Sequence, residues 1–167
     1  MSRGFVKEDD QEDIPMVPPR AELPNGVTNY VTQSGWEALL AEKQMLIDEK
    51  NQSNINNENE RRIASNHINA KLHLLNNRIA EAKIVDLKQQ PQNEIRFGAI
   101  VTFTIEATKT LKTFQIVGVD EADTTKGKIS FLSPLAKALL NKKKGEKAIL
   151  KTGNEERVFE VLEIVYR

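Results

Sequence analysis

Two groups of acidic residues could, by their side-chain chemistry, bind a metal ion. Glu58 and Glu60 lie in the stretch 57–62, and a denser acidic run spans residues 8–13. Carboxylates bind divalent cations well only when they converge on one point. Glu58 and Glu60 are two positions apart, which on a helix separates their side chains by about 200°. The run 8–13 contains no glycine to make a tight cation loop, so it is expected to attract such ions only loosely.

The remaining chemistry-bearing residue types also argue against an enzyme. His67 and His73 are six positions apart, which is about 600° of helical rotation, so their rings are expected to point to different faces. The chain has no cysteine, and this excludes cysteine zinc sites and thiol nucleophiles. It also lacks a phosphate-binding glycine loop and a serine-nucleophile elbow. We therefore predict no catalytic residues, no metal site and no cofactor.

Charge and hydropathy indicate whether nucleic acid or a membrane is an expected partner. The 167 residues include 24 basic and 24 acidic ones, for a formal net charge of zero. Proteins that grip DNA phosphates usually carry a basic excess, so any contact with nucleic acid is expected to be indirect. The sequence has no apolar stretch of about 18 residues and no apolar run near its start. These features predict a cytoplasmic protein without a membrane partner.

Residues 30–87 are expected to form an antiparallel helical hairpin. Thr32 or Ser34 can supply the N-cap oxygen of the first helix. The second helix carries a heptad seam with steps of four and three, made of Ile68, Leu72, Leu75, Ile79 and Ala82. The asparagine-rich stretch 51–60 between them favours a turn. Because a lone hairpin buries little apolar surface, it is expected to project from the domain that follows.

Residues 94–167 carry a series of strand signals. Apolar and β-branched residues alternate at 99–105, 113–117, 128–131, 147–150 and 157–165. One short helix interrupts the strands, with Ser133 as its N-cap, Pro134 as its first residue and Gly145 beyond its end. The predicted fold class is α+β: a helical hairpin (coiled coil) followed by an antiparallel β domain with one short helix.

Residues 1–29 form an acidic and proline-rich arm before these two parts. Its prolines remove backbone donors and its acidic residues repel one another, so helix and sheet interior are both disfavoured. Two interpretations follow. The arm is either a flexible, solvated segment, or an extended segment that docks on a partner or on the body of this protein.

An ordered set of short motifs carries a family resemblance. They are Ile116-Val117-Gly118-Val119-Asp120-Glu121, then Ile129-Ser130, Ser133-Pro134, Ala138-Leu139-Leu140 and Lys144-Gly145-Glu146, with Tyr30 to Gly35 and Ala82 to Asp86 upstream. In this order they closely resemble the GreA/GreB (Gre) family of transcription elongation factors over roughly residues 30–167. Each motif alone is weak, whereas the ordered combination is specific.

The resemblance implies a fold and a partner. It implies that residues 94–167 form the FKBP-like C-terminal domain of the family and dock on the rim of the secondary channel of RNA polymerase. The coiled coil would then point towards the active site, with nucleic acid contacted only through the polymerase complex. The family's contact loop corresponds to Leu132, Ser133, Pro134 and Leu135. A rigid capped turn also makes a preorganised contact, so the loop can both begin a helix and bind.

The tip of the hairpin departs from the family pattern. Cleavage-stimulating members carry an acidic pair there, which helps to hold a second catalytic metal and orient water. In this chain Asn57 and Glu60 keep the spacing, but the first acid is replaced by an amide. Arg61 and Arg62 stand close enough to pair with the nearby acids. The hairpin is also about 15 residues shorter than the family pattern, which reduces its reach by roughly 11 Å.

We therefore expect an RNA-polymerase regulator without strong cleavage stimulation. Two alternatives stay open. The first is a true transcript-cleavage factor that uses Glu58 and Glu60 as its acids. The second is an FKBP-like peptidyl-prolyl isomerase, which would need an aromatic-lined proline pocket. The aromatic residues of the β domain fall mostly at strand positions expected to face its core, which disfavours that second alternative.

Overall fold

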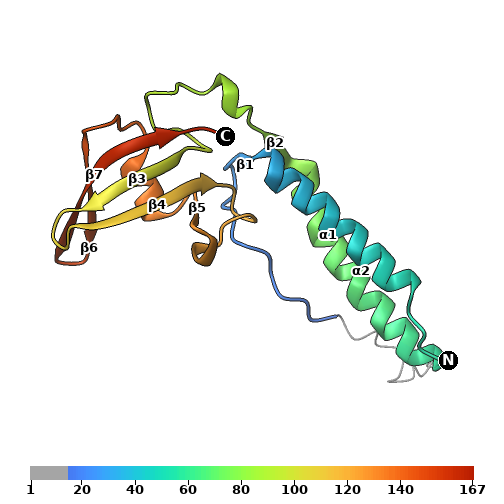
Figure 1. Cartoon of the computed structure of the whole chain (residues 1–167). Helices are drawn as coiled ribbons and strands as arrows, with labels where there is room; N and C mark the ends of the chain where they lie inside the picture. The colour runs from blue at the N-terminus through green and yellow to red at the C-terminus, as the bar shows by residue number, and fades with distance from the viewer. Residues whose placement is uncertain (1–14) are drawn as a thin grey trace, which may run out of the picture.

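The computed structural model describes residues 15–167 and shows a long helical hairpin projecting from a curved β domain (Figure 1). This arrangement confirms the predicted α+β class. The acidic run 8–13 lies outside the described residues. Within residues 15–167, no helix is long and apolar enough to cross a membrane.

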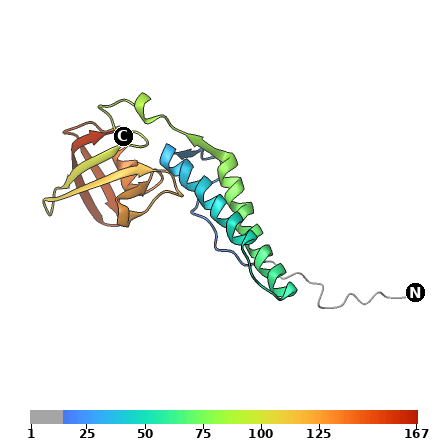
Figure 2. The same ribbon diagram turned by 45° about the vertical axis from the view of Figure 1, so that its right-hand side comes forward.

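The hairpin consists of α1 (Gln33–Asn51) and α2 (Glu58–Glu81). Thr32, rather than Ser34, is the N-cap of α1, and its hydroxyl accepts a hydrogen bond from the amide of Gly35 at 2.9 Å. The seam between the helices is formed by buried Leu39, Leu46, Ile68 and Leu75, with Leu72, Ile79 and Ala82 partly buried beside them. The predicted heptad seam is therefore confirmed, and Figure 2 shows the two helices packed along their length.

A pair of short strands closes the base of the hairpin. β1 (Asn29–Val31) precedes α1, β2 (Ala82–Ile84) follows α2, and the two pair in parallel. The buried Asn29 amide adds a hydrogen bond to the carbonyl of Arg78 at 3.2 Å. Sequence analysis did not predict these strands, because three residues are too few to show an alternating pattern. Their pairing fixes the points at which the chain enters and leaves the hairpin.

The β domain contains a five-stranded sheet. Its strands are β3 (Ile100–Ile105), β4 (Thr110–Val117), β5 (Lys128–Ser130), β6 (Lys147–Thr152) and β7 (Glu155–Val165), in the order β5-β4-β3-β7-β6. Three of the four pairings are antiparallel, as predicted. β5, however, runs parallel to β4, because residues 118–127, which include the 3-10 helix η3 (Thr124–Lys126), return the chain to the same end of the sheet.

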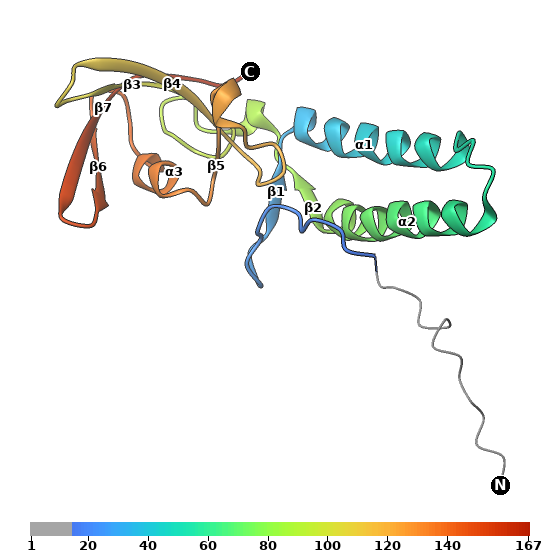
Figure 3. The same ribbon diagram turned by 90° about the horizontal axis from the view of Figure 1, so that it is seen from below.

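The core of the β domain lies between the sheet and the short helix α3 (Pro134–Leu139). Ala136 and Leu139 of α3 are fully buried against Phe103, Phe159 and other core residues of the sheet. Figure 3 shows α3 on the concave side of the curved sheet. A second 3-10 helix, η2 (Leu87–Gln89), lies in the chain that connects the hairpin to the β domain.

Candidate functional site

The proposed contact loop, Leu132 to Leu135, is a rigid turn at the start of α3. Ser133 is the N-cap predicted from the sequence, and its hydroxyl accepts a hydrogen bond from the amide of Ala136 at 3.2 Å. Pro134 is exposed, whereas Leu135 is partly buried against the core of the β domain. The amide of Leu132 donates to the hydroxyl of Ser130 at 3.1 Å. The loop therefore offers Pro134 to solvent on a preorganised backbone, and Leu135 is partly used for packing.

At the hairpin tip, Asn57 serves as the N-cap of α2. Its side-chain oxygen accepts hydrogen bonds from the amides of Asn59 at 2.9 Å and Glu60 at 3.2 Å. A side chain at this cap replaces backbone partners that the first turn of a helix lacks. Since both hydrogen bonds use the oxygen that a metal ion would need, the cap and metal binding compete for the same atom.

The two acidic residues of the tip lie in the first turn of α2. Glu58 and Glu60 are both exposed, where the partial positive charge of the helix N-terminus stabilises carboxylates. Arg61 donates to the carbonyl of Ile55 at 3.1 and 2.9 Å, and Arg62 donates to the side chain of Asn59 at 3.2 Å. The expected pairing of these arginines with the acids is thus not found among residues 15–167. No group of three or more potential metal ligands is found in that range either.

Replacing Asn57 with alanine should destabilise the tip by about 1 kcal/mol, because two amides in the first turn of α2 lose their acceptor. Thermal unfolding and hydrogen exchange of residues 58–61 would measure the loss. Asn56→Ala is the matched control, since Asn56 lies in the same turn, is exposed and is not the cap. Equal stability of the two variants would contradict the capping role.

The base of the hairpin meets the β domain at a tightly packed joint, which we define by Gly118, Asp120 and Glu121 after β4 and by Tyr30, Thr32 and Gly35 at the start of the hairpin. A Cβ atom on Gly118 would lie 2.5 Å from the carbonyl oxygen of Tyr30. A Cβ atom on Gly35 would lie 2.7 Å from a carboxylate oxygen of Glu121. Gly118 therefore allows a backbone approach that a larger residue would block, whereas a side chain at Gly35 would require the Glu121 carboxylate to move.

Glu121 connects the β domain to the cap of α1. The hydroxyl of Thr32 donates to one of its carboxylate oxygens at 2.6 Å, and Lys128 Nζ lies 2.9 Å from the other. The same Thr32 hydroxyl accepts the amide hydrogen of Gly35, so one side chain caps the helix and binds the β domain. The Glu121 side chain is only 10% exposed. Buried carboxylates are stable only when they are paired in this way.

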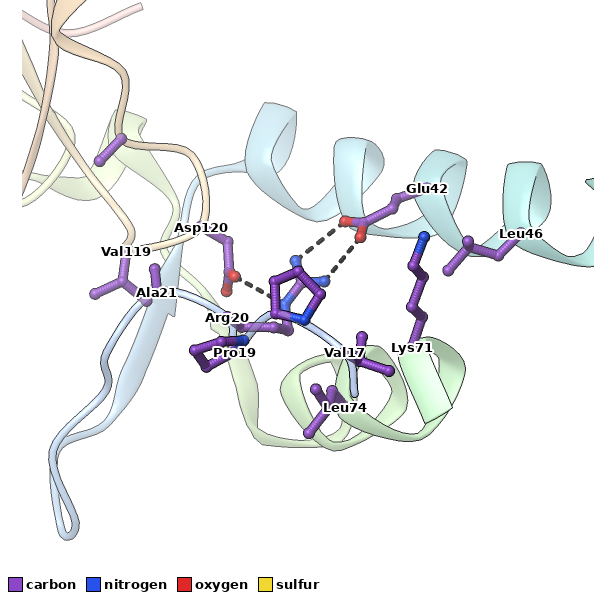
Figure 4. A pocket seen from close by; sticks show the side chains of 12 residues that line it. Val17, Pro19, Arg20, Ala21, Glu42, Leu46, Lys71, Leu74, Val119 and Asp120 are labelled. Carbon is purple, nitrogen blue, oxygen red and sulfur yellow. Dashed lines mark hydrogen bonds and ion pairs between the residues drawn. The ribbon is translucent and has the colours of Figure 1, made fainter. Parts of the chain in front are cut away.

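Asp120 joins three segments of the chain. Arg20 Nε of the arm lies 3.0 Å from its Oδ1, and Arg78 Nε of α2 lies 3.0 Å from its Oδ2, the latter an ion pair rather than a directed hydrogen bond. The side chains of Asp120 and Arg78 are 8% and 10% exposed. Arg20 also donates two hydrogen bonds to Glu42 of α1, at 2.8 and 3.0 Å (Figure 4). These bonds to Glu42 are the main reason that the pKa of Arg20 is raised.

Aromatic rings form the apolar part of the joint. Tyr30, Phe97 and Phe131 contact one another pairwise, with ring centroids 5.6–5.9 Å apart. Phe103 and Phe159 lie inside the β domain, and Phe114 and Tyr166 pack against its core. The aromatic residues that an isomerase would need around a proline pocket are therefore used in the joint and the core.

Comparison with known proteins concerns mainly the β domain. Residues 90–166 match the family model described as transcription elongation factor GreA/GreB, C-terminal. The transcription elongation factor GreA of Hyphomonas neptunium is 37% identical over 100 residues, which cover 60% of this chain and 64% of that protein. This C-terminal match decides the assignment of the β domain. Residues 90–166 form a GreA/GreB C-terminal domain.

Other relatives show the extent of the likeness. GreA of Bradyrhizobium diazoefficiens is 37% identical over 101 residues, covering 60% of this chain and 64% of the relative. The chain thus spans slightly less than two thirds of the length of these relatives. Among solved structures, GreA factor homolog 1 of Thermus thermophilus is 23% identical, covers 83% of this chain and 99% of its own, and has a TM-score of 0.39. At that similarity the structure adds nothing to the assignment.

The motifs of the Gre resemblance meet at the joint. Gly118, Asp120 and Glu121 come from one motif, and Tyr30, Thr32 and Gly35 from another, about 90 residues away along the chain. The sequence shows both motifs but not that they contact each other, and no sequence pattern singles out Arg20 or Arg78. The available signal was an Asp-Glu pair that begins three residues after the buried end of β4, a position where acids usually need partners.

Proposed function

We propose that this chain is a regulator that binds RNA polymerase through its β domain and places its hairpin in the secondary channel. The family assignment of residues 90–166 is the observation that carries the proposal. The preorganised turn at Ser133 and the exposed Pro134 support the contact loop inferred from the family. Nucleic acid would be contacted only through the polymerase complex, in the cytoplasm.

We further propose that the hairpin modulates elongation or initiation without strongly stimulating transcript cleavage. Asn57 uses its oxygen to cap α2, and the next acids along the helix are exposed and two positions apart. The runner-up is a cleavage factor that relies on Glu58 and Glu60. Their exposure at the end of the hairpin is the observation that favours it.

Binding is tested by incubating the full chain with core RNA polymerase and separating the complex by size. We expect co-elution, and we expect a cleavage factor of the family to displace the chain, since both would occupy the channel rim. Failure to co-elute at micromolar concentrations of both proteins would overturn the proposed function. Catalysis of prolyl isomerisation by the chain would instead support the isomerase.

Changing Pro134 to aspartate should weaken polymerase binding about tenfold or more. The change places a charge in a contact that is expected to lose its water, and contact residues of this kind contribute roughly 1–2 kcal/mol. The helix should tolerate it, because Ser133 still caps α3 and an acid near the N-terminus is favourable. The dissociation constant measures the effect.

Thr108→Asp is the matched control for charge. Thr108 is exposed in the turn between β3 and β4, outside the contact loop. It should bind like the wild type. If folded Pro134→Asp binds as tightly as Thr108→Asp, the contact loop has been assigned to the wrong residues.

A further inference from the structure

We propose that the described part of the arm, residues 15–28, is a brace that sets the angle between the hairpin and the β domain, with Arg20 as the positioning residue. The inference rests on the proposed function, because the angle matters only if the hairpin is used as a probe. The first interpretation of the arm, a flexible solvated segment, does not describe the part around Arg20. This part docks on the body of the protein, as the second interpretation predicted.

The hairpin is attached to the β domain at points that are well separated along α1. The first is its N-cap, Thr32, bound to Glu121 at 2.6 Å. The second is Glu42, about 15 Å further along the helix at 1.5 Å per residue. Arg20 spans from Glu42 to Asp120 and thus links this second point to the β domain. A helix held only at one end can rotate about that end, whereas a second attachment opposes the rotation.

Arg20 is well suited to this role. Its guanidinium has five donors in a rigid, planar fork, so it can bind two carboxylates in one fixed geometry. Three of its bonds are formed, with lengths of 2.8–3.0 Å, and its side chain is 19% exposed. In Figure 4 the Arg20 guanidinium lies between Asp120 of the β domain and Glu42 of α1. Arginine stays charged at any physiological pH, so Arg20 itself remains able to donate these bonds.

The neighbouring arm residues hold Arg20 in place. Val17 and Pro19 line a pocket of about 450 Å³ together with Leu46 of α1 and Leu74 of α2. The side chain of Arg78 donates to the carbonyl of Ala21, which anchors the arm on the other side of Arg20. Two adjacent prolines, Pro18 and Pro19, restrict the backbone of the segment. A stiff segment that is anchored beside Arg20 transmits force better than a flexible one.

The mechanical consequence is large because the hairpin is long. The 24 residues of α2 span about 36 Å. A rotation of about 10° at the base would therefore move the tip by roughly 6 Å, several times the tolerance of a hydrogen bond. The brace thus affects the position of the hairpin tip relative to the β domain more than it affects the stability of the fold.

The test measures the distance between the tip and the β domain in the free, full-length chain. Because the chain has no cysteine, spin labels can be attached specifically to Asn56→Cys at the tip and Thr108→Cys in the turn after β3. We expect a narrow distance distribution in the otherwise unchanged protein. Arg20→Ala should shift or broaden it by about 5 Å, and Glu42→Gln should do the same from the other end of the link. Arg20→Lys should be intermediate, since lysine cannot form the fork.

Arg157→Ala is the control, because it removes an exposed arginine whose nearest acid, Glu155, lies 3.9 Å away. It should leave the distribution unchanged. Distributions for Arg20→Ala and Glu42→Gln that superimpose on the control would overturn the brace. Since polymerase is absent from this experiment, its result is independent of whether the chain binds the enzyme.

Discussion

Adding this protein to a stalled, backtracked RNA polymerase complex with magnesium should increase RNA shortening less than about tenfold, even at saturating concentration. Such an increase corresponds to less than about 1.4 kcal/mol of barrier lowering. Effective stimulation would require two carboxylates converging on one metal ion. In this chain Asn57 occupies one of the two matching positions and caps α2 with the oxygen that would be needed.

The other features of the tip point in the same direction. Glu58 and Glu60 diverge around the helix, and the arginines that follow oppose the approach of a cation. The family resemblance implies a hairpin about two turns per helix shorter than the family pattern, in which case its acids would stop short of the active site. These deficits compound, because a misplaced ligand cannot compensate for a missing one.

Two variants separate these causes. Asn57→Asp restores an acid while keeping a good cap, and we expect it to remain weak because the hairpin is no longer than before. The unchanged chain and Asn57→Asp should both still compete with a cleavage factor of the family for RNA polymerase. Robust shortening by the unchanged chain, lost in a Glu58→Ala/Glu60→Ala variant, would establish the cleavage factor instead.

Replacing Asp120 with alanine should lower the free energy of unfolding by roughly 2–3 kcal/mol. This is somewhat less than the loss expected when a fully buried ion pair is broken, because Arg20 is partly exposed. The change leaves Arg78, whose side chain is 10% exposed, without its only carboxylate among the described ion pairs. It also removes one end of the link through Arg20. For a chain of this size we expect the midpoint of thermal unfolding to fall by about 5–10 °C.

Trp36 offers a local probe of this change. It is the only tryptophan and packs partly buried beside the hairpin seam, near the joint. Its fluorescence should report unfolding at a lower denaturant concentration in Asp120→Ala than in the wild type.

Glu156→Ala is the matched control, because Glu156 is also paired, 3.4 Å from Lys151, but its side chain is 58% exposed. Exposed ion pairs contribute little to stability, so Glu156→Ala should lower the free energy of unfolding by less than about 0.5 kcal/mol. Similar losses for the two variants would show that the joint is not held by Asp120.

The sequence alone determined those features of this protein that depend on local patterns. Heptad spacing predicted the seam through Ile68 and Leu75, since residues at steps of three and four share one face of a helix. Ser133 and Pro134 predicted the start of α3 because cap and first-turn preferences involve only neighbouring residues. Alternation predicted the five strands of the β domain, and the ordered motifs predicted the family.

The tertiary structure decided the features that depend on residues distant in sequence. The parallel direction of β5 follows from the path of residues 118–127, which no alternation pattern records. Gly118 and Gly35 could be recognised as parts of motifs, but the atoms that they allow to approach lie about 90 residues away. The partners of Arg20 are 22 and 100 positions distant, in two different parts of the molecule. A charged side chain in a proline-rich segment looks the same in sequence whether it is solvated or buried, because only folding brings Glu42 and Asp120 together around it.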